Sequence, residues 1–247
     1  MILKDKCAVV TGAASGIGRA IAEELARLGA HVVINDIHRE EAERFKNELL
    51  KQGWSADAYP SDVSDSGQVQ ALYAHIKNTV GKVDILVNNA GIAQPARITE
   101  MTDEMWDRMI KVHLYGTFYN CREAIKIMEK NGGGKIINIA SDLGQLGCES
   151  YAHYSAAKGG IIALTKSLAR EWAPRILVNA VAPSGTRTAL LKHFGPDYEA
   201  EEAKKYPLKR LAEPWEIAKT VAFLAGPDSD FYTGQVLTPN GGIVMNG

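Results

Sequence analysis

The sequence predicts one α/β domain whose doubly wound parallel sheet carries helices on both faces. Its 247 residues are enough for one large domain of this class and short for two. Six short apolar runs are rich in Val and Ile and lack polar alternation, as strands buried on both faces should be. They cover residues 7–10, 31–34, 84–87, 135–139, 176–182 and 234–238. Stretches of helical period separate them, which indicates strand–helix alternation with ligands bound beyond the carboxyl ends of the strands.

Two of the intervening stretches show the apolar period of a helix. In the first, the residues at i, i+4, i+8 and i+11 are Ile17, Ile21, Leu25 and Leu28. Gly29 follows in the position that commonly ends a helix. In the second, the apolar stripe consists of Val69, Leu72, Tyr73, Ile76 and Val80. We also expect helices around residues 103–130 and 154–172.

Charge and cysteine content exclude several classes of partner. The formal net charge is -1 and no basic or acidic block occurs, so we expect no nucleic-acid partner. Cys7, Cys121 and Cys148 are odd in number and lack metal-ligand spacing, so we expect neither a disulfide nor a metal site. Without an 18-residue apolar run or a signal-peptide layout, the chain is expected to be soluble and cytoplasmic, with no membrane contact.

A glycine-rich turn, TGAASGIG, follows the first apolar run, where a strand should turn into a helix. Gly12 permits a tight turn, Gly16 lets the backbone approach phosphate groups, and Gly18 lets helix and strand pack closely. A helix N-terminus offers free N–H groups and a partial positive charge that attract a diphosphate. We therefore expect a nucleotide site that also includes Ser15 and Ile17. The spacing is GxxxGxG rather than GxGxxG, and a glycine-rich turn without a ligand is the alternative.

Asp36 closes the second apolar run and bears on the choice of cofactor. A carboxylate there can accept hydrogen bonds from adenosine ribose hydroxyls, and it would repel a 2′-phosphate. Few cations are close in sequence, since Arg39 lies several residues further on. The position therefore favours NAD over NADP, and a solvated acidic residue is the alternative. Further on, Asp62 and Val63 in the segment SDV are candidates to hold an adenine edge.

Two amides and a small turn follow the third apolar run in the sequence DILVNNAG. Asn88 can tie neighbouring strand ends together. Ala90 and Gly91 leave room for a flat cofactor over the backbone. Asn89, Ala90 and Gly91 are therefore candidate cofactor contacts.

The segment YAHYSAAKGG carries a candidate acid/base residue. If it is helical, Tyr154 and Lys158 lie at i and i+4 on one face, whereas Tyr151 is two turns from the lysine. A free tyrosine has a pKa of about 10, so a nearby ammonium would have to lower it for exchange with an alcohol or ketone. A surface Tyr and Lys on an ordinary helix is the alternative. Ser141 lies 13 residues before Tyr154, at the end of the run KIINI.

Together these motifs resemble the short-chain dehydrogenase/reductase family. TGxxxGxG, NNAG, a serine 13 residues before YxxxK and a downstream NAVAP run occur in one order, from Thr11 to the segment TGQVLTPNGG. The resemblance implies a Rossmann-like fold over residues 1–247. It also implies that Tyr154 is the general acid/base and that Lys158 lowers the pKa of Tyr154 and binds the nicotinamide ribose. Ser141 would hydrogen-bond the substrate oxygen.

The chain departs from the family pattern at two places. Where the family usually has Asn in a pattern like VNLxGxF, this chain has His113 in VHLYGTF. His113 is a candidate catalytic residue whose ring could exchange protons, and a packed helix histidine is the alternative. In APSGTRT a serine replaces the usual glycine after Pro183, and Gly185 could take over the flexibility of the turn. We expect Thr186 and Thr188 to lie near the nicotinamide carboxamide.

The resemblance implies more than one function. We expect NAD-dependent oxidation of a secondary alcohol, such as a polyol, sugar acid or hydroxy acid, with residues 188–207 as a lid over the substrate. The chain also closely resembles NADPH-dependent 3-oxoacyl-acyl-carrier-protein reductases. Asp36 argues against NADPH, whereas Arg175 could serve an acidic carrier. A catalytically silent nucleotide-binding scaffold is a further alternative, against which the intact Ser141, Tyr154 and Lys158 argue.

Family members are commonly tetramers, so a homotetramer is expected here. The helices around 103–130 and 154–172 are candidates for the contacts, with apolar residues such as Ile161, Leu164 and Leu168. The alternative is that these apolar faces cover the sheet.

Overall fold

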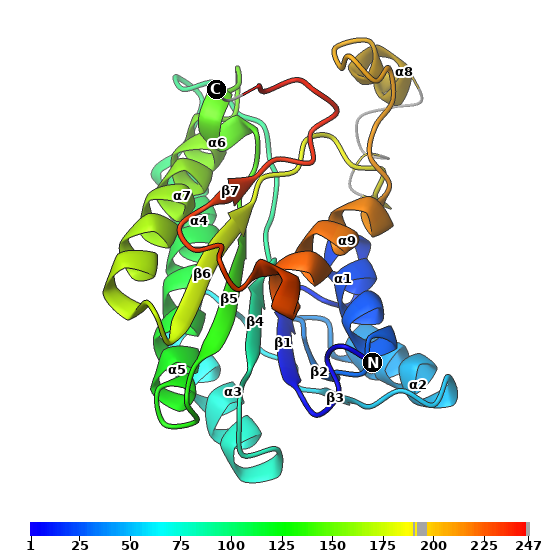
Figure 1. Cartoon of the computed structure of the whole chain (residues 1–247). Helices are drawn as coiled ribbons and strands as arrows, with labels where there is room; N and C mark the ends of the chain where they lie inside the picture. The colour runs from blue at the N-terminus through cyan, green and yellow to red at the C-terminus, as the bar shows by residue number, and fades with distance from the viewer. Residues whose placement is uncertain (190, 192–196, 246–247) are drawn as a thin grey trace.

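The computed structural model describes residues 1–189, 191 and 197–245, and it contains the predicted parallel sheet (Figure 1). Within these residues, seven strands pair in the order β3-β2-β1-β4-β5-β6-β7, and every pair is parallel. They are β1 (Cys7–Thr11), β2 (His31–Asn35), β3 (Ala56–Ala58), β4 (Ile85–Asn88), β5 (Gly134–Ile139), β6 (Ile176–Val181) and β7 (Val236–Leu237). The six apolar runs each match a strand. Only β3 was missed, because this three-residue edge strand has Asp57 at its centre and forms no apolar run.

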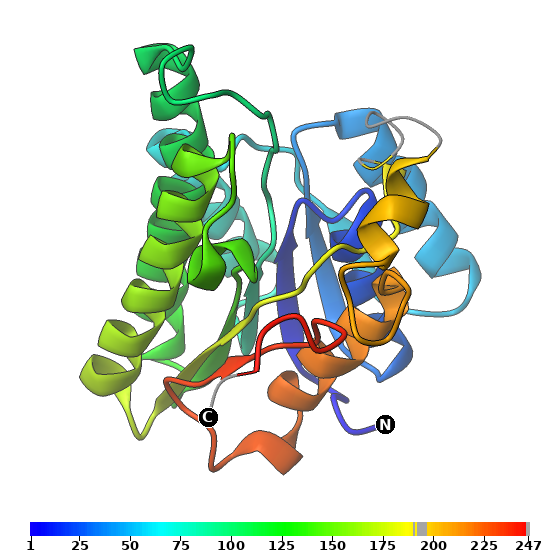
Figure 2. The same ribbon diagram turned by 90° about the horizontal axis from the view of Figure 1, so that it is seen from above.

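Helices cover both faces of the sheet, which confirms the doubly wound α/β fold (Figures 1 and 2). On one face lie α1 (Gly16–Arg27), α2 (Arg39–Lys51) and α9 (Pro214–Ala225). On the other lie α3 (Ser66–Thr79), α5 (Gly116–Met128) and α7 (Ala152–Trp172). The expected helix at 103–130 is interrupted, since α4 (Asp103–Ile110) leads through a π-helical turn, Lys111–Tyr115, into α5. The short helices α6 (Leu143–Leu146) and α8 (Tyr198–Ala203) lie at the same end of the molecule (Figure 1).

The predicted apolar stripes face the sheet. In α1, Ile21 and Leu25 are fully buried, and Gly29 follows the helix with φ of +103°, as expected of a helix-ending glycine. In α3, Leu72 and Ile76 are likewise fully buried. Burying each such side chain contributes roughly 2 kcal/mol, so packing against the sheet is the main reason these segments stay helical.

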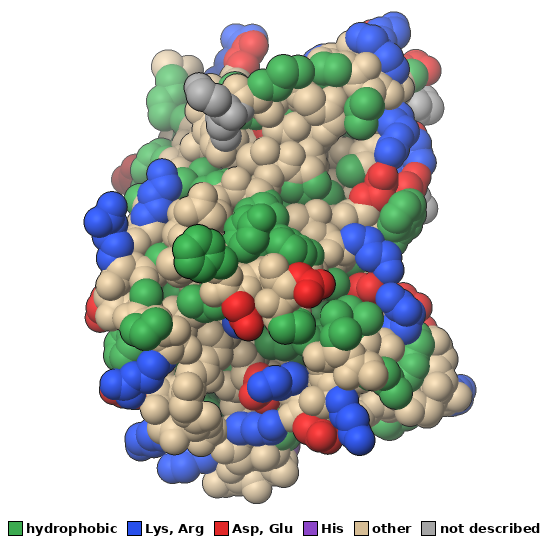
Figure 3. All heavy atoms as spheres, in the orientation of Figure 1, with side chains coloured by type: hydrophobic (Ala, Val, Ile, Leu, Met, Phe, Trp, Pro, Cys, Tyr) green, Lys and Arg blue, Asp and Glu red, His purple; other side chains and the backbone are tan. Residues whose placement is uncertain are grey.

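Several hydrophobic side chains remain exposed. Figure 3 shows such side chains gathered near the middle of one face, over β7 and the neighbouring α9. Trp106, Tyr115 and Phe118, from α4 to α5, are also exposed. On α7, however, Ile161 is only 1% exposed and packs in a buried cluster with Ala140, Ala180 and Ala182. It is therefore a core residue, and its expected role in a subunit contact is wrong.

The remaining features of the fold concern the cysteines, the helices and the possible metal ligands. Cys7 and Cys121 are buried and Cys148 is exposed, and none of the three forms a disulfide. Over the described part of the chain, no helix is both long and apolar enough to cross a bilayer. No group of three or more His, Cys, Asp or Glu residues in that part is arranged to hold a metal ion.

Candidate active site

The glycine-rich turn joins β1 to α1 at the carboxyl edge of the sheet. Gly12 and Gly16 have φ of +62° and +54°, a conformation that residues with a side chain rarely adopt. A Cβ on Gly18 would lie 2.1 Å from the Gly12 carbonyl oxygen, so Gly18 is required for close packing. Ser15 begins α1 without a side-chain cap, so it leaves the first backbone N–H groups of this helix uncapped. This arrangement fits a bound diphosphate.

The NNAG segment after β4 is clamped to this turn. The Asn89 side-chain amide donates to the carbonyl oxygens of Thr11 and Gly12, at 3.0 and 3.1 Å. In return, the Thr11 hydroxyl oxygen accepts hydrogen bonds from the backbone N–H groups of Asn89 and Ala90. The two segments therefore form one rigid edge. Asn89 and Ala90 lie beside Gly12, in a position to contact the same ligand.

Asp36 lies next to the glycine-rich turn, as expected from its place after β2. It is 8% exposed, and its carboxylate accepts hydrogen bonds from the N–H groups of Ala14 and His38 at 3.0 and 3.1 Å. The Ala14 contact holds the carboxylate against the turn. The remaining lone pairs of the carboxylate are the ones that ribose hydroxyls could use.

Asp62 and Val63 follow β3 and have local partners. The Asp62 carboxylate accepts from both the N–H and the hydroxyl of Ser64, at 2.8 and 2.7 Å. Val63 is buried, and its side chain would lie 2.9 Å from a Cβ on Gly116, so it packs on α5. The Asp62 carboxylate is thus engaged locally, and its expected contact with an adenine stays a prediction.

Tyr154 and Lys158 share one face of α7, which confirms the predicted helix. Lys158 is 3% exposed, and its ammonium donates to the Ile139 carbonyl at 2.6 Å and lies 5.6 Å from the centre of the Tyr154 ring. A Cβ on Gly144 would be 2.8 Å from the Lys158 backbone, so α6 packs directly on α7. This packing brings Ser141, which follows β5, close enough to the Tyr154 hydroxyl to affect the pKa of that phenol.

Burial sets the protonation of this pair. It raises the pKa of Tyr154 to about 12; the nearby Ser141 hydroxyl acts in the opposite direction, and the charge of Asp142 adds to the rise. Burial also lowers the pKa of Lys158 to about 7. The net shift of the Tyr154 pKa is therefore opposite to the one expected beside Lys158. The Lys158 ammonium lies 5.6 Å from the centre of the Tyr154 ring, and burial penalises its charge.

His113 lies in the π-helical turn, 2% exposed, and packs edge-on against Tyr154 with 5.2 Å between ring centres. Its Nε2 lies 3.1 Å from the Ile92 N–H and 2.7 Å from the Ile92 carbonyl oxygen. Burial, followed by the charge of Lys158, lowers the pKa of His113 to about 3. The ring is therefore neutral near pH 7, which argues against the expected proton exchange and favours the packing alternative.

The His113 ring accounts for the need for a glycine at position 91. A Cβ at Gly91 would lie 2.3 Å from Cε1 of His113. Gly91 therefore admits the histidine ring, and its expected contact with the cofactor stays a prediction.

The segment after β6 lies over the glycine-rich turn. The side chain of Thr188 would lie 3.5 Å from a Cβ on Gly16. Thr186 is buried, and its hydroxyl donates to the Ser184 carbonyl at 2.9 Å. The Pro183 carbonyl accepts the N–H of Asp142, which joins this segment to the serine side of the site.

Gly185 has a different role from the expected one. A Cβ there would lie 2.8 Å from the Tyr206 hydroxyl, which itself accepts the Gly185 N–H at 3.1 Å. Its φ is not positive, so the residue is small to admit Tyr206 rather than to make the turn flexible. Tyr206 is 2% exposed and its hydroxyl donates to Glu202, which ties the end of the predicted lid to this segment.

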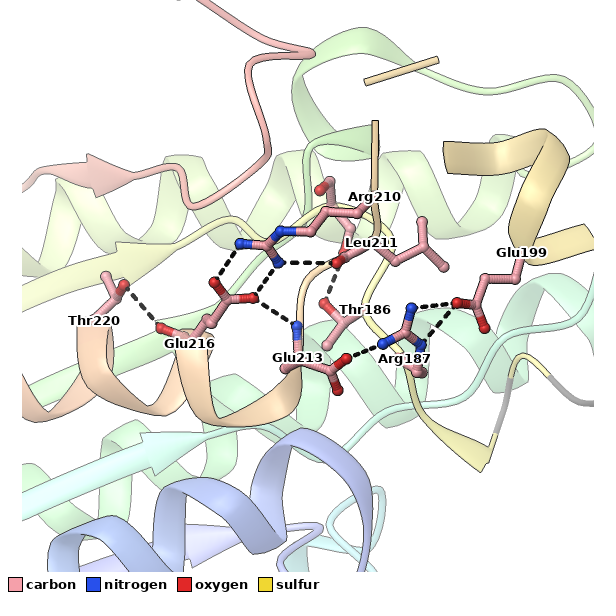
Figure 4. A network of polar contacts seen from close by, with 9 residues as sticks. Thr186, Arg187, Glu199, Arg210, Leu211, Glu213, Glu216 and Thr220 are labelled. Carbon is pink, nitrogen blue, oxygen red and sulfur yellow. Dashed lines mark hydrogen bonds and ion pairs between the residues drawn. The ribbon is translucent and has the colours of Figure 1, made fainter. Parts of the chain in front are cut away.

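Ion pairs anchor the same segment on its outer side (Figure 4). Arg187 pairs with Glu199 of α8 and with Glu213 at the start of α9. Arg210 makes two parallel hydrogen bonds to Glu216 at 2.6 and 2.7 Å. Of the predicted lid, residues 190 and 192–196 lie outside the described residues.

Several residues that build the site were not found by sequence reasoning. The amide of Asn88 donates to Asn138 at 2.8 Å, which confirms that Asn88 ties strand ends together, and Asn138 in turn donates to Thr165 of α7 at 3.0 Å. An asparagine inside the otherwise apolar run KIINI was the available signal for Asn138. Asp142 and Tyr206 had no such signal, because each is fixed in place by a segment far away in the sequence, at Pro183 and Gly185 respectively.

Comparisons with known proteins agree with this geometry. The model of the family described as enoyl-(acyl carrier protein) reductase matches residues 12–244. An uncharacterised oxidoreductase of Bacillus subtilis, YxbG, is 40% identical over 98% of this chain and 92% of its own length. A 3-oxoacyl-[acyl-carrier-protein] reductase of Thermotoga maritima is 36% identical over 99% of this chain and all of its own.

A solved structure is also similar over the whole chain. It is a short-chain dehydrogenase/reductase from Brucella melitensis, titled glucose/ribitol dehydrogenase, with a TM-score of 0.93, 35% identity and 99% coverage of both chains. The protein therefore belongs to the short-chain dehydrogenase/reductase family. Members of this family are NAD(P)-dependent oxidoreductases that act on CH–OH groups.

Proposed function

We propose that this oxidoreductase interconverts a secondary alcohol and its ketone with NAD, using Tyr154 as the general acid/base. The observation that carries the proposal is the meeting of Ser141, Tyr154 and Lys158 at one end of the sheet. The nicotinamide, when bound, supplies or accepts the hydride. In reduction, the protonated phenol of Tyr154 donates its proton to the ketone oxygen. Lys158 would hold the nicotinamide ribose and pass the proton onward.

Asp36 supports NAD over NADP. Its carboxylate is held beside the glycine-rich turn, where a 2′-phosphate would meet it. Among the described residues it takes part in no ion pair. Arg19 of α1 is occupied elsewhere, since it pairs with Glu48 and its guanidinium carbon lies 4.2 Å from the centre of the Phe45 ring. A 2′-phosphate would therefore meet an uncompensated negative charge.

The substrate has two candidates. The first is a small polyol, sugar acid or hydroxy acid. The second is a 3-oxoacyl group on an acyl carrier protein, and the names of relatives that are 36–38% identical favour it. Arg175, the expected carrier contact, lies just before β6, at the sheet edge opposite Ser141 of the same chain. Assembly as a homotetramer and a cytoplasmic location stay predictions.

Absorbance at 340 nm tests the proposal directly. The protein is assayed with both cofactors against polyols, sugar acids, hydroxy acids and a 3-oxoacyl thioester of pantetheine. Turnover of a small alcohol with NAD supports the first candidate, and preferred reduction of the thioester with NADPH replaces it by the second. Binding of cofactor without any turnover would contradict the proposed function and favour a silent nucleotide-binding protein.

A further inference from the structure

Asp142 lies directly beside the candidate catalytic serine and is 4% exposed. One oxygen of its carboxylate accepts the hydroxyl proton of Ser141 at 2.9 Å and the N–H of Leu143 at 2.8 Å. Its own N–H donates to the Pro183 carbonyl at 3.0 Å. Within the described part of the chain, no cationic side chain forms an ion pair with it. A carboxyl group is thus held in one place, next to the atom that should meet the substrate.

This contact limits what Ser141 can donate. A serine hydroxyl has one proton, and here that proton points to Asp142. The Ser141 oxygen also lies 3.1 Å from the Leu143 N–H. A reacting carbonyl gains negative charge on its oxygen and needs a donor there. While Ser141 donates to Asp142, it cannot be that donor.

We propose that Asp142 is a positioning residue: its ionised carboxylate holds the Ser141 proton away from the substrate oxygen, and its protonation releases that proton for catalysis. The inference rests on the proposed function, because it takes Ser141 as the group that meets the substrate oxygen. The ionised carboxylate holds the hydroxyl by a charge-assisted hydrogen bond, whereas a neutral carboxyl holds it more weakly.

The surroundings of Asp142 raise its pKa and so extend the pH range in which the carboxyl is neutral. Burial raises the pKa of Asp142 to about 6; the hydrogen bonds from Ser141 and Leu143 oppose the rise, and the negative charge of Glu202 on α8 adds to it. The titratable side chains that interact with Asp142 from other elements are Cys148, Tyr154, Tyr198, Glu202 and Tyr206. Of these, Glu202 is the carboxylic acid, and it forms an ion pair with Lys205. Release of Ser141 therefore falls within an accessible pH range and is lost as pH rises.

The pH profile of ketone reduction tests the inference. The probe is ethyl acetoacetate, reduced with NADH or NADPH between pH 5 and 9 by wild type and by Asp142→Asn. Wild-type kcat/KM should fall on the order of 10- to 100-fold as Asp142 ionises, which is the cost of breaking a hydrogen bond to a charged group. The asparagine keeps an acceptor for the Leu143 N–H but has no charge, so its profile should lack this fall.

Asp65→Asn is the matched control. Asp65 also accepts backbone N–H groups at the start of a helix, but it does so at α3 and is not in contact with Ser141. Its profile should follow that of wild type. The inference is overturned if Asp142→Asn keeps the wild-type fall.

A second measurement needs no substrate. Aspartate carboxyl carbons are labelled with ¹³C and titrated by NMR in the full chain, with and without NADH, and Asp142 is assigned from its Asn variant. We expect Asp142 to titrate above the solvent-exposed aspartates, to shift upward in Ser141→Ala and to shift downward in Glu202→Gln. A midpoint that does not respond to Ser141→Ala overturns the inference.

The two proposals can fail separately. If Tyr154→Phe retains turnover, the proposed function is wrong whatever Asp142 does. If Tyr154→Phe is inactive while Asp142→Asn keeps the wild-type profile, the proposed function stands and the role of Asp142 is wrong.

Discussion

The two halves of the candidate site differ in the kinds of groups that form them. The cofactor half, around Gly12, Gly18 and Asn89, is held by backbone close contacts and neutral amide hydrogen bonds. The catalytic half, around Tyr154 and Lys158, is a set of buried titratable side chains. The comparison teaches that backbone shape should determine cofactor binding in the cofactor half. In the catalytic half, burial determines the protonation of the side chains. Substitutions in the cofactor half should therefore act at every pH, whereas those in the catalytic half should change the response to pH.

The largest effect is expected in the catalytic half, from Tyr154→Phe. Loss of the acid/base group should lower kcat on the order of 10²- to 10⁴-fold, while NADH still binds, because the ring and its packing remain. NADH fluorescence measures binding, and absorbance at 340 nm measures turnover. Tyr151→Phe is the control, since its ring lies 6.1 Å from that of Tyr154 but its hydroxyl has no proposed role. Comparable losses in both variants would contradict the assignment.

Next in size is Gly18→Ala in the cofactor half. The added Cβ would lie 2.1 Å from the Gly12 carbonyl oxygen, so the turn must shift. We expect a loss of about 3 kcal/mol in unfolding free energy and weaker cofactor binding, both independent of pH. Urea unfolding and NADH titration measure the two effects. Gly67→Ala, in the first turn of α3, meets only the end of a side chain at 3.3 Å and should change little.

A smaller, pH-dependent effect is expected at His113. Its pKa falls from 6.5 in the unfolded chain to about 3 in the fold, so the folded state is favoured above pH 6.5 and loses stability as pH falls toward 3. Between pH 7 and 5, wild type should lose about 2 kcal/mol relative to His113→Asn. Urea unfolding at both pH values measures this. A pH-independent difference between the proteins would show that folding leaves the pKa of His113 unchanged.

The smallest effect is expected at Asp36. Asp36→Asn keeps an acceptor for the Ala14 N–H but removes the charge that would repel a 2′-phosphate. The ratio of kcat/KM for NAD to that for NADP should fall about tenfold, the size of one partly screened charge interaction. Asp57→Asn, on β3 and paired with His75, is the control and should leave the ratio unchanged. An unchanged ratio in Asp36→Asn would remove the argument for NAD.

The fold was largely predictable because buried parallel strands are apolar throughout and the helices between them carry apolar stripes. The strand β3 was not, since three residues centred on Asp57 have no such pattern. Nor was the π-helical turn at His113, whose ring packs against Gly91 and Tyr154, both far from it in the sequence. Here tertiary contacts decided what local sequence could not.

The sequence predicted where the candidate site residues lie better than it predicted their protonation states. Spacing along α7 correctly placed Tyr154 and Lys158 on one face. It could not give the direction of their pKa shifts, since these depend on burial by chain segments far away in the sequence. For the same reason the role of Gly185 was misjudged, because Tyr206, whose hydroxyl occupies the space above it, lies 21 residues further on.

The central claim is that Tyr154 is the group that exchanges a proton with the substrate. Proton release on cofactor binding tests this claim most directly. The protein groups alone keep the phenol protonated at pH 8, so the positive charge of the oxidised nicotinamide must lower its pKa. With a pH indicator in weak buffer, wild type should release more protons on binding NAD⁺ than Tyr154→Phe does, and NADH should produce no such difference. Equal release by the two proteins, with equal NAD⁺ binding, would contradict the account.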